Sequence, residues 1–177
     1  MLYFFTFFLF LSEEELGGKG GLRSSSLKSS ALLDPDGPDK SNFLDDLRKH
    51  SSREISHIGE EICNFSEDEA DELTWGRGSE YGTMSFRSKS DFGLLSLFHI
   101  TSKAQIKFCV NLLRQKEVQK NIMRDFVIKL ESNFIRDYDK SNYPIDSFED
   151  MNDLFTTHSQ VEKLKQCIEG IAYRLRQ

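Results

Sequence analysis

Residues 101–138 read TSKAQIKFCVNLLRQKEVQKNIMRDFVIKLESNFIRDY and contain neither proline nor glycine. Apolar side chains recur in this stretch every three to four positions, which is the spacing of one face of an α-helix. Thr101 or Ser102 offers a hydroxyl group that can cap the first turn. The pattern therefore predicts one long amphipathic helix, and its most regular apolar series consists of Ile122, Phe126, Leu130 and Phe134.

Three basic residues are offset from that apolar series, so they belong to the opposite side of the predicted helix. They are Lys116, Lys120 and Arg124, which we call the basic stripe. A charged helix face is most often simply solvated. Two alternatives are docking on an acidic protein segment, in this chain or in a partner, and contact with phosphates. We favour protein contact and consider a nucleic-acid partner unlikely on this pattern, because interleaved aromatic residues and a groove-reading motif are missing.

The C-terminal residues 159–177 carry the cleanest apolar repeat in the chain, with alternating steps of three and four. This a/d register extends over two heptads and predicts a helix whose seam packs on another helix, as in a coiled coil or a bundle. We predict a mainly α fold, with a helical hairpin or small helical bundle at residues 93–177. The candidate partner-interface residues are Val161, Leu164, Ile168, Ile171 and Leu175, together with Ile122, Phe126, Leu130 and Phe134.

Residues 43–92 are predicted to be an acidic, partly helical and mostly disordered segment. A helix is expected over 41–63, with a break near Ser51 and Ser52 where apolar positions are missing. Ser66 precedes three acidic residues and is a candidate phosphosite, although a solvated acidic loop is the simpler interpretation. Trp75 is followed by Gly76 and Gly78 and is a candidate exposed anchor for a partner, the alternative being a ring that folds back on the helical part. Residues 81–100 show no clean period, and no sheet of consequence is expected.

Residues 13–42 are rich in Gly, Ser, Asp and Pro and predict a disordered linker. Before it, Leu2 to Leu11 form an apolar run that is too short to span a bilayer and lacks the features of a secretory signal. The run at 1–12 is interpreted either as a gene-model artefact read from a pyrimidine tract or as an interfacial membrane anchor. On the first interpretation, the chain is a fragment of a larger protein.

The residue types that support catalysis or metal binding are not clustered along the sequence. The chain has 177 residues, a net charge of −6, three widely spaced cysteines and four histidines, none of them at zinc-finger spacing. We expect packed, reduced thiols, no cofactor, no metal site and no enzymatic activity. The predicted function is a non-catalytic helical module for protein–protein interaction or assembly, in the cytoplasm or nucleus. The alternative is a membrane-surface protein held by the apolar run and the basic helix.

Overall fold

The computed structural model describes residues 39–77 and 80–177, and its first two helices are separated where the sequence indicated. Helix α1 spans Lys40–His50 and α2 spans Arg53–Glu69. Asp39 caps α1 by accepting a hydrogen bond from the Asn42 amide at 2.8 Å. Ser52 caps α2 by accepting one from the Ile55 amide at 3.2 Å. The predicted break at Ser51 and Ser52 is confirmed.

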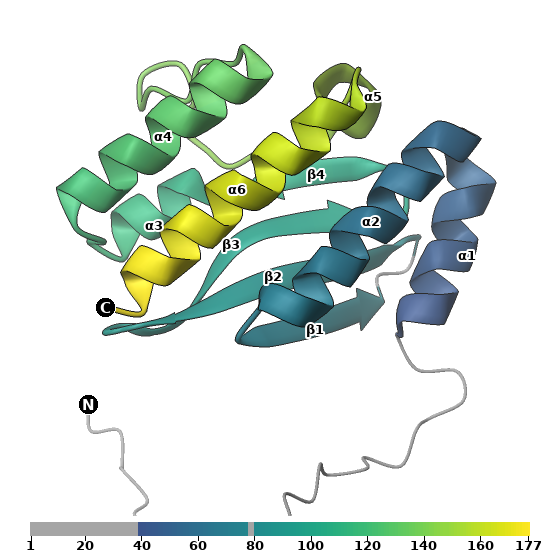
Figure 1. Cartoon of the computed structure of the whole chain (residues 1–177), viewed down its shortest axis with the longest axis horizontal. Helices are drawn as coiled ribbons and strands as arrows, with labels where there is room; N and C mark the ends of the chain where they lie inside the picture. The colour runs from purple at the N-terminus through teal and green to yellow at the C-terminus, as the bar shows by residue number, and fades with distance from the viewer. Residues whose placement is uncertain (1–38, 78–79) are drawn as a thin grey trace, which may run out of the picture. The chain divides into compact units, whose positions relative to one another are not determined.

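A five-stranded antiparallel sheet follows these helices, and the prediction of a mainly α fold was therefore wrong. The strands are β1 (Glu72–Arg77), β2 (Gly82–Ser90), β3 (Gly93–Thr101), β4 (Gln105–Phe108) and β5 (Glu149–Asp150). They lie in the order β1-β2-β3-β4-β5, so each strand pairs with the next one along the chain (Figure 1). Helices cover one face of this sheet, which makes the fold an α+β arrangement.

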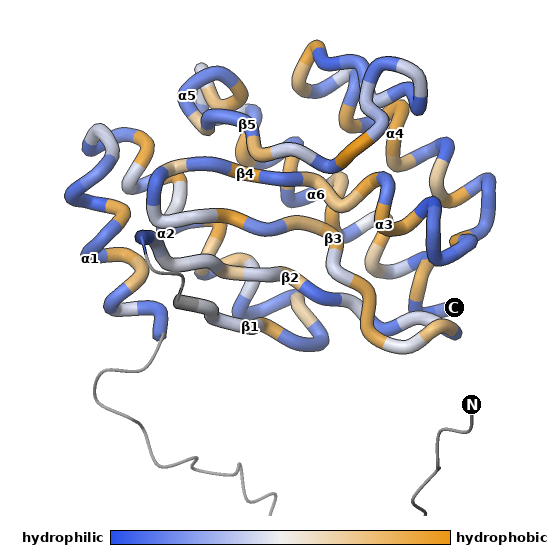
Figure 2. Tube along the Cα trace, turned by 180° about the vertical axis from the view of Figure 1, so that it is seen from behind, coloured by the Kyte–Doolittle hydropathy of each residue, from blue (hydrophilic) through white to orange (hydrophobic). Residues whose placement is uncertain are grey.

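The two faces of the sheet differ in chemistry because side chains alternate along each strand. Met84 and Phe86 of β2 pair with Ile100 and Phe98 of β3, and all four are buried on the helix-covered face. The opposite face carries polar residues such as Ser85 and is not covered by helices (Figure 2). In β3 this alternation is interrupted at Leu97, because Phe86 pairs with Phe98 and Arg87 with Ser96, which leaves Leu97 as an extra residue of the strand. Leu97 and Phe98 are consecutive and both buried, so the period of two was hidden in the sequence.

The single long helix predicted for residues 101–138 is instead a strand end, a strand and two helices. After β4 come α3 (Val110–Gln115) and α4 (Lys120–Phe134). The chain turns at three residues with positive φ, namely Ala104, Glu117 and Ile135, with φ of 56°, 56° and 54°. Glycine is the usual residue in this left-handed conformation, so its absence concealed all three turns.

The C-terminal helix α6 (His158–Leu175) follows the short α5 (Met151–Leu154), and α6 was expected from the apolar repeat at 159–177. Helix α6 runs antiparallel to α4, with Arg174 bonded to Asp125 at 2.6 Å. Its apolar seam does not form a coiled coil, because it packs against α4, α2 and the sheet in one continuous core. The antiparallel pairing of α6 with part of the 101–138 stretch is confirmed.

The expectation of a mostly disordered segment at 43–92 is corrected by α1, α2 and the first two strands, which occupy most of it. Leu73 and Trp75 of β1 pack against the core, and Phe43, Leu44 and Leu47 of α1 are buried in it. The predicted linker at 13–42 falls within the described residues only at 39–42, which are the N-cap and the first turn of α1. The apolar run at 1–12 lies outside the described residues.

Candidate functional site: a groove beside helix α4

The wall of the candidate site is built by a backbone-closed turn between α3 and α4. Glu117 adopts the left-handed conformation, and its amide donates to the Arg114 carbonyl at 3.2 Å. The Val118 amide donates to the Leu113 carbonyl at 3.3 Å. These two bonds form a Schellman motif, which satisfies the last carbonyls of α3 and turns the chain sharply. Val118 is thereby buried, and α4 begins two residues later.

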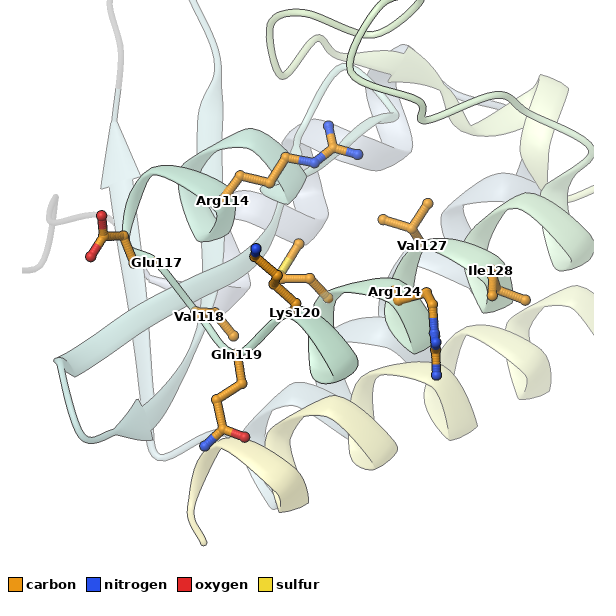
Figure 3. Close-up of a pocket in the computed structure, with 9 residues that line it drawn as sticks. Arg114, Glu117, Val118, Gln119, Lys120, Arg124, Val127 and Ile128 are labelled. Atoms are coloured by element: carbon orange, nitrogen blue, oxygen red, sulfur yellow. The ribbon is translucent and has the colours of Figure 1, made fainter.

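This turn and the adjacent side of α4 enclose a groove of about 630 Å³. The groove lies between the α3 end of the turn and the first turns of α4 (Figure 3). Such a volume falls within the range of protein ligand pockets. Three kinds of side chain line it: apolar (Val118, Met123, Val127, Ile128), basic (Arg114, Lys120, Arg124) and other polar ones (Glu117, Gln119).

Arg114 is held in place by the loop that follows α4. Its guanidinium donates to the Tyr138 carbonyl at 2.6 Å and to the Asn111 side chain at 2.9 Å. The N-terminal amides of α3 are also fixed, because Asp146 accepts from the amides of Asn111 and Leu112 at 2.8 and 3.0 Å. This side of the groove is therefore preorganised, with a positive charge that is anchored at its edge.

Lys120 and Arg124 lie on the opposite, α4 side of the groove and are both exposed. Lys120 makes no ion pair among the described residues. Arg124 lies 3.6 Å from Asp125, but Asp125 also binds Arg174, and that hydrogen bond holds the pKa of Asp125 below its ordinary value. The groove thus keeps an excess of positive charge, with Glu117 as its one acidic lining residue.

The structure divides the predicted basic stripe between two elements. Lys120 and Arg124 share one side of α4 and line the groove. Lys116 is the C-cap of α3 and is not among the lining residues, so the three residues do not form a stripe on one helix as predicted. Arg114 and Val118 were missed because the prediction of a continuous helix hid the turn that gives them their positions.

The predicted partner-interface residues lie in the interior instead of on the surface. In the folded chain they pack against one another and against the sheet, so their side chains are covered by this chain itself. We therefore correct their assignment from partner interface to core. All nine belong to the buried cluster: Ile122, Phe126, Leu130 and Phe134 of α4, and Val161, Leu164, Ile168, Ile171 and Leu175 of α6.

The two remaining sequence candidates are also enclosed. Ser66 is fully buried in α2 and its hydroxyl donates to the Ile62 carbonyl at 2.7 Å, so a kinase cannot reach it in the folded chain. Trp75 is half-buried, with its ring centroid 5.4 Å from that of Phe43. Its ring packs on α1, which is the alternative considered for it, and it does not form an exposed anchor.

Two polar clusters outside the groove bring together side chains of the kinds that occur in catalytic or metal sites. On the open sheet face, Ser85 Oγ lies 2.6 Å from His99 Nδ1, and burial lowers the pKa of His99 to about 4. The imidazole is therefore neutral at physiological pH. Among the described residues, no carboxylate bonds to its other nitrogen, so the pair lacks the orienting group of a catalytic triad.

The second cluster consists of Glu61, His158 and Glu162, whose ligand atoms lie within 4.8 Å of one another. The Lys165 ammonium is 2.5 Å from Glu61 Oε1 and 2.9 Å from Glu162 Oε1, so the two carboxylates already share one positive charge. We interpret the cluster as an ion-pair network that joins α2 to α6.

The three cysteines are free and buried, as expected for packed thiols. Burial raises the pKa of Cys63, Cys109 and Cys167 to about 12 in each case. Because the thiolate is the reactive form, these groups are poor nucleophiles at neutral pH. The groove beside α4 is therefore the stronger candidate for a functional site.

Comparison with known proteins adds no family to this description. No family model matches the chain, and no curated protein or solved structure matches it either. None of the helices in the described part of the chain is long and apolar enough to cross a bilayer. The groove must be interpreted from its own geometry.

Proposed function

We propose that this chain is a non-catalytic protein-interaction module whose groove beside α4 binds a segment of a partner protein that carries both apolar and acidic side chains. The observation that carries the proposal is the pairing of an apolar groove lining with three basic residues, Arg114, Lys120 and Arg124. This replaces the helix faces that the sequence suggested as an interface, because those faces are buried.

The apolar lining and the basic residues would contribute differently to binding. Burial of apolar surface over Val127 and Ile128, the apolar lining residues that keep exposed surface, would supply much of the affinity, since removal from water is worth about 25 cal/mol per Å². Lys120 and Arg124 are exposed, so each single charge pair would add little to the affinity. Together they would raise the association rate and select against basic partners.

A nucleic-acid ligand is less compatible with the same features. The chain has a net charge of −6, and none of the described residues that line the groove is an aromatic one on which a base could stack. An acidic protein segment needs only a few cations beside an apolar surface, which is what the groove offers. Charge complementarity therefore favours a protein partner.

The proposal can be tested by selecting peptides from a displayed random library on the full chain. We expect the enriched peptides to combine Asp or Glu with Leu, Ile or Phe. In fluorescence anisotropy they should bind the K120E/R124E variant at least tenfold more weakly than the wild type. The affinity for the wild type should also fall as salt is added, because exposed charges are screened.

The matched control is the K49E/K163E variant, which makes the same change in net charge at exposed positions outside the groove lining. It should bind the selected peptides like the wild type. Failure to enrich peptides, or enriched peptides that bind K120E/R124E unchanged, would refute the proposal. Flotation with phosphatidylserine vesicles that depends on Lys120 and Arg124, without acidic peptides in the selection, would favour a membrane ligand instead.

A further inference from the structure

The five-stranded sheet ends in two edge strands, which differ in how they are protected against pairing with another chain. β5 is only two residues long, and both residues are acidic, which discourages a further strand. β1 is six residues long and contains neither lysine nor proline, while Thr74 and Trp75 at its centre favour strand structure. It is the outermost strand (Figure 1), and no described strand pairs with its outer side. β1 is therefore an unprotected edge.

The backbone groups that point outward from β1 follow from the pairing of β2. The Ser102 amide donates to the Gly82 carbonyl at 2.9 Å, so Gly82 faces β3. Successive residues of a strand direct their backbone groups to opposite sides, so residues 83, 85 and 87 face β1. Their pairing partners are Gly76, Thr74 and Glu72. Leu73 and Trp75 consequently direct their N–H and C=O groups outward, where no described residue hydrogen-bonds to them.

We infer that β1 pairs antiparallel with β1 of a second copy of this chain, which joins the two sheets edge to edge. In the register that sets Thr74 opposite Thr74 of the second copy, Leu73 lies opposite Trp75 of the second copy. Because both residues direct their backbone groups outward, each such pair exchanges two hydrogen bonds and leaves none of these groups without a partner. Both copies use the same surface, as a two-fold dimer requires. The inference does not depend on the groove beside α4.

On the open face of the sheet, the same register avoids a clash of size and of charge. Glu72 lies opposite Gly76 of the second copy, and a Cβ atom at Gly76 would have no neighbour nearer than 4.0 Å, so there is room for the glutamate side chain. The two Glu72 residues are four positions apart across the pair, which is about 13 Å. Each is also paired with Arg87 of its own copy, so its charge does not protect the edge.

On the helix-covered face, the register brings apolar side chains together. Leu73 and Trp75 pack against the core, but each keeps part of its surface exposed. Leu73 opposite Trp75 of the second copy forms an aliphatic–aromatic cross-strand pair, which stabilises a sheet. The assembly stops at two copies, because the pairing uses β1 of both and the remaining edges are the short, acidic β5 strands. A closed dimer therefore fits this edge better than an open fibre.

Thr74→Lys and Thr74→Glu test the inference, because the two-fold axis places residue 74 opposite itself. Each variant alone brings two like charges together and should raise the dimer dissociation constant at least tenfold. An equimolar mixture of the two variants should dimerise within about threefold of the wild type, because opposite charges then meet. Sedimentation equilibrium of the full chain from about 10 µM to about 1 mM covers the range expected for a small interface. The control is Gln105→Lys, which adds a charge to the open face on β4 and should leave dimerisation unchanged.

Amide hydrogen exchange followed by NMR tests the register residue by residue. The Leu73 and Trp75 amides should exchange at least tenfold more slowly at the highest concentration than at the lowest, because only the dimer bonds them. The Thr74 amide already faces β2 and should change by less than about twofold. In Thr74→Lys, the concentration dependence at Leu73 and Trp75 should disappear.

The possible outcomes separate this inference from the proposed function. A full chain that stays monomeric at about 1 mM would overturn the dimer, and so would a dimer that Thr74→Lys and Thr74→Glu leave intact. Slow exchange at Leu73 and Trp75 in the monomer would also overturn it, because the chain itself would then cover the edge. None of these results bears on the groove, which the K120E/R124E variant tests through peptide binding.

Discussion

The α1–α2 and α3–α4 junctions both reverse the chain between two helices, but they use different chemistry. At the first, Ser52 caps α2 through its side chain, and Ser51 donates its hydroxyl to the Leu47 carbonyl at 2.7 Å. At the second, the turn is closed by backbone bonds, and Gln119, the N-cap of α4, makes no side-chain cap bond. A side-chain cap is visible in a sequence, whereas a backbone-closed turn can carry almost any residue.

The two junctions also differ in how closely they are packed. Between α1 and α2, Leu47 is buried. A Cβ atom placed on Gly59 would lie only 2.4 Å from Leu47 Cδ2, so the two helices are in close contact there. Between α3 and α4, the space beside the turn remains open as the groove. The first junction therefore contributes to the core, and the second provides an accessible surface. Four predictions test this contrast.

The largest effect is expected at the packed junction. Leu47→Ala should lower the free energy of unfolding by about 3 kcal/mol, because it removes a buried side chain and leaves a cavity. Val118→Ala, at the open junction, should lower it by no more than about 1.5 kcal/mol, since the groove lies beside it. Urea denaturation followed by circular dichroism measures both values. Equal losses would show that the two junctions are packed alike.

A double-mutant cycle tests the close approach of Gly59 to Leu47. Gly59→Ala alone should destabilise the fold, because the new Cβ atom meets Leu47 in a packed core. In the Leu47→Ala background the same change should be stabilising, because the clash is gone and Ala favours a helix interior over Gly. The expected coupling energy is about 2 kcal/mol. Additive effects in urea denaturation would contradict the geometry.

This contrast explains which parts of the fold could be predicted from the sequence. The break near Ser52 and helix α6 were predicted because their signals are side chains: caps and apolar periodicity. The structure of residues 101–138 was not predicted. Its turns lie at Ala104, Glu117 and Ile135, which adopt the left-handed conformation, and glycine at these positions would have marked the turns in the sequence. The sheet was missed because the extra residue Leu97 interrupts the apolar alternation of β3, and because the next buried residue of β2 after Phe86 is the polar Ser88.

The candidate site was predicted only in part, for the same physical reason. Lys120 and Arg124 were recognised because they are offset from the apolar series of α4, and that offset depends only on local helical geometry. Arg114 and Val118 reach the groove through the turn at Glu117, so their role depends on tertiary structure. The apolar series of α4 and α6 predicted buried helix faces, but the spacing alone does not show whether this chain or a partner protein covers those faces.

A smaller effect, of opposite sign, is expected at the open junction. Glu117→Gly should raise the free energy of unfolding by about 1 kcal/mol, because glycine adopts a positive φ without steric strain. Gln115→Gly, two residues earlier and inside α3, is the matched control and should lower it by about the same amount. Thermal unfolding of the two variants measures the difference. Destabilisation by both would show that residue 117 is not left-handed.

The smallest effects are expected at the N-caps of α2 and α4. One substitution removes the side-chain cap of α2, and another adds a side-chain cap to α4. Ser52→Ala should lower the free energy of unfolding by about 0.5–1 kcal/mol, because the Ile55 amide loses its acceptor. Gln119→Ser should raise it by about 0.5 kcal/mol, because a serine hydroxyl can accept from the Asn121 amide of the first turn of α4. The Ile122 amide already donates to Asn121 Oδ1 at 2.9 Å. Chemical denaturation of each variant measures these changes. A loss of stability in Gln119→Ser would mean that the backbone at this N-cap does not suit a side-chain cap, and that the open junction depends on its backbone bonds alone.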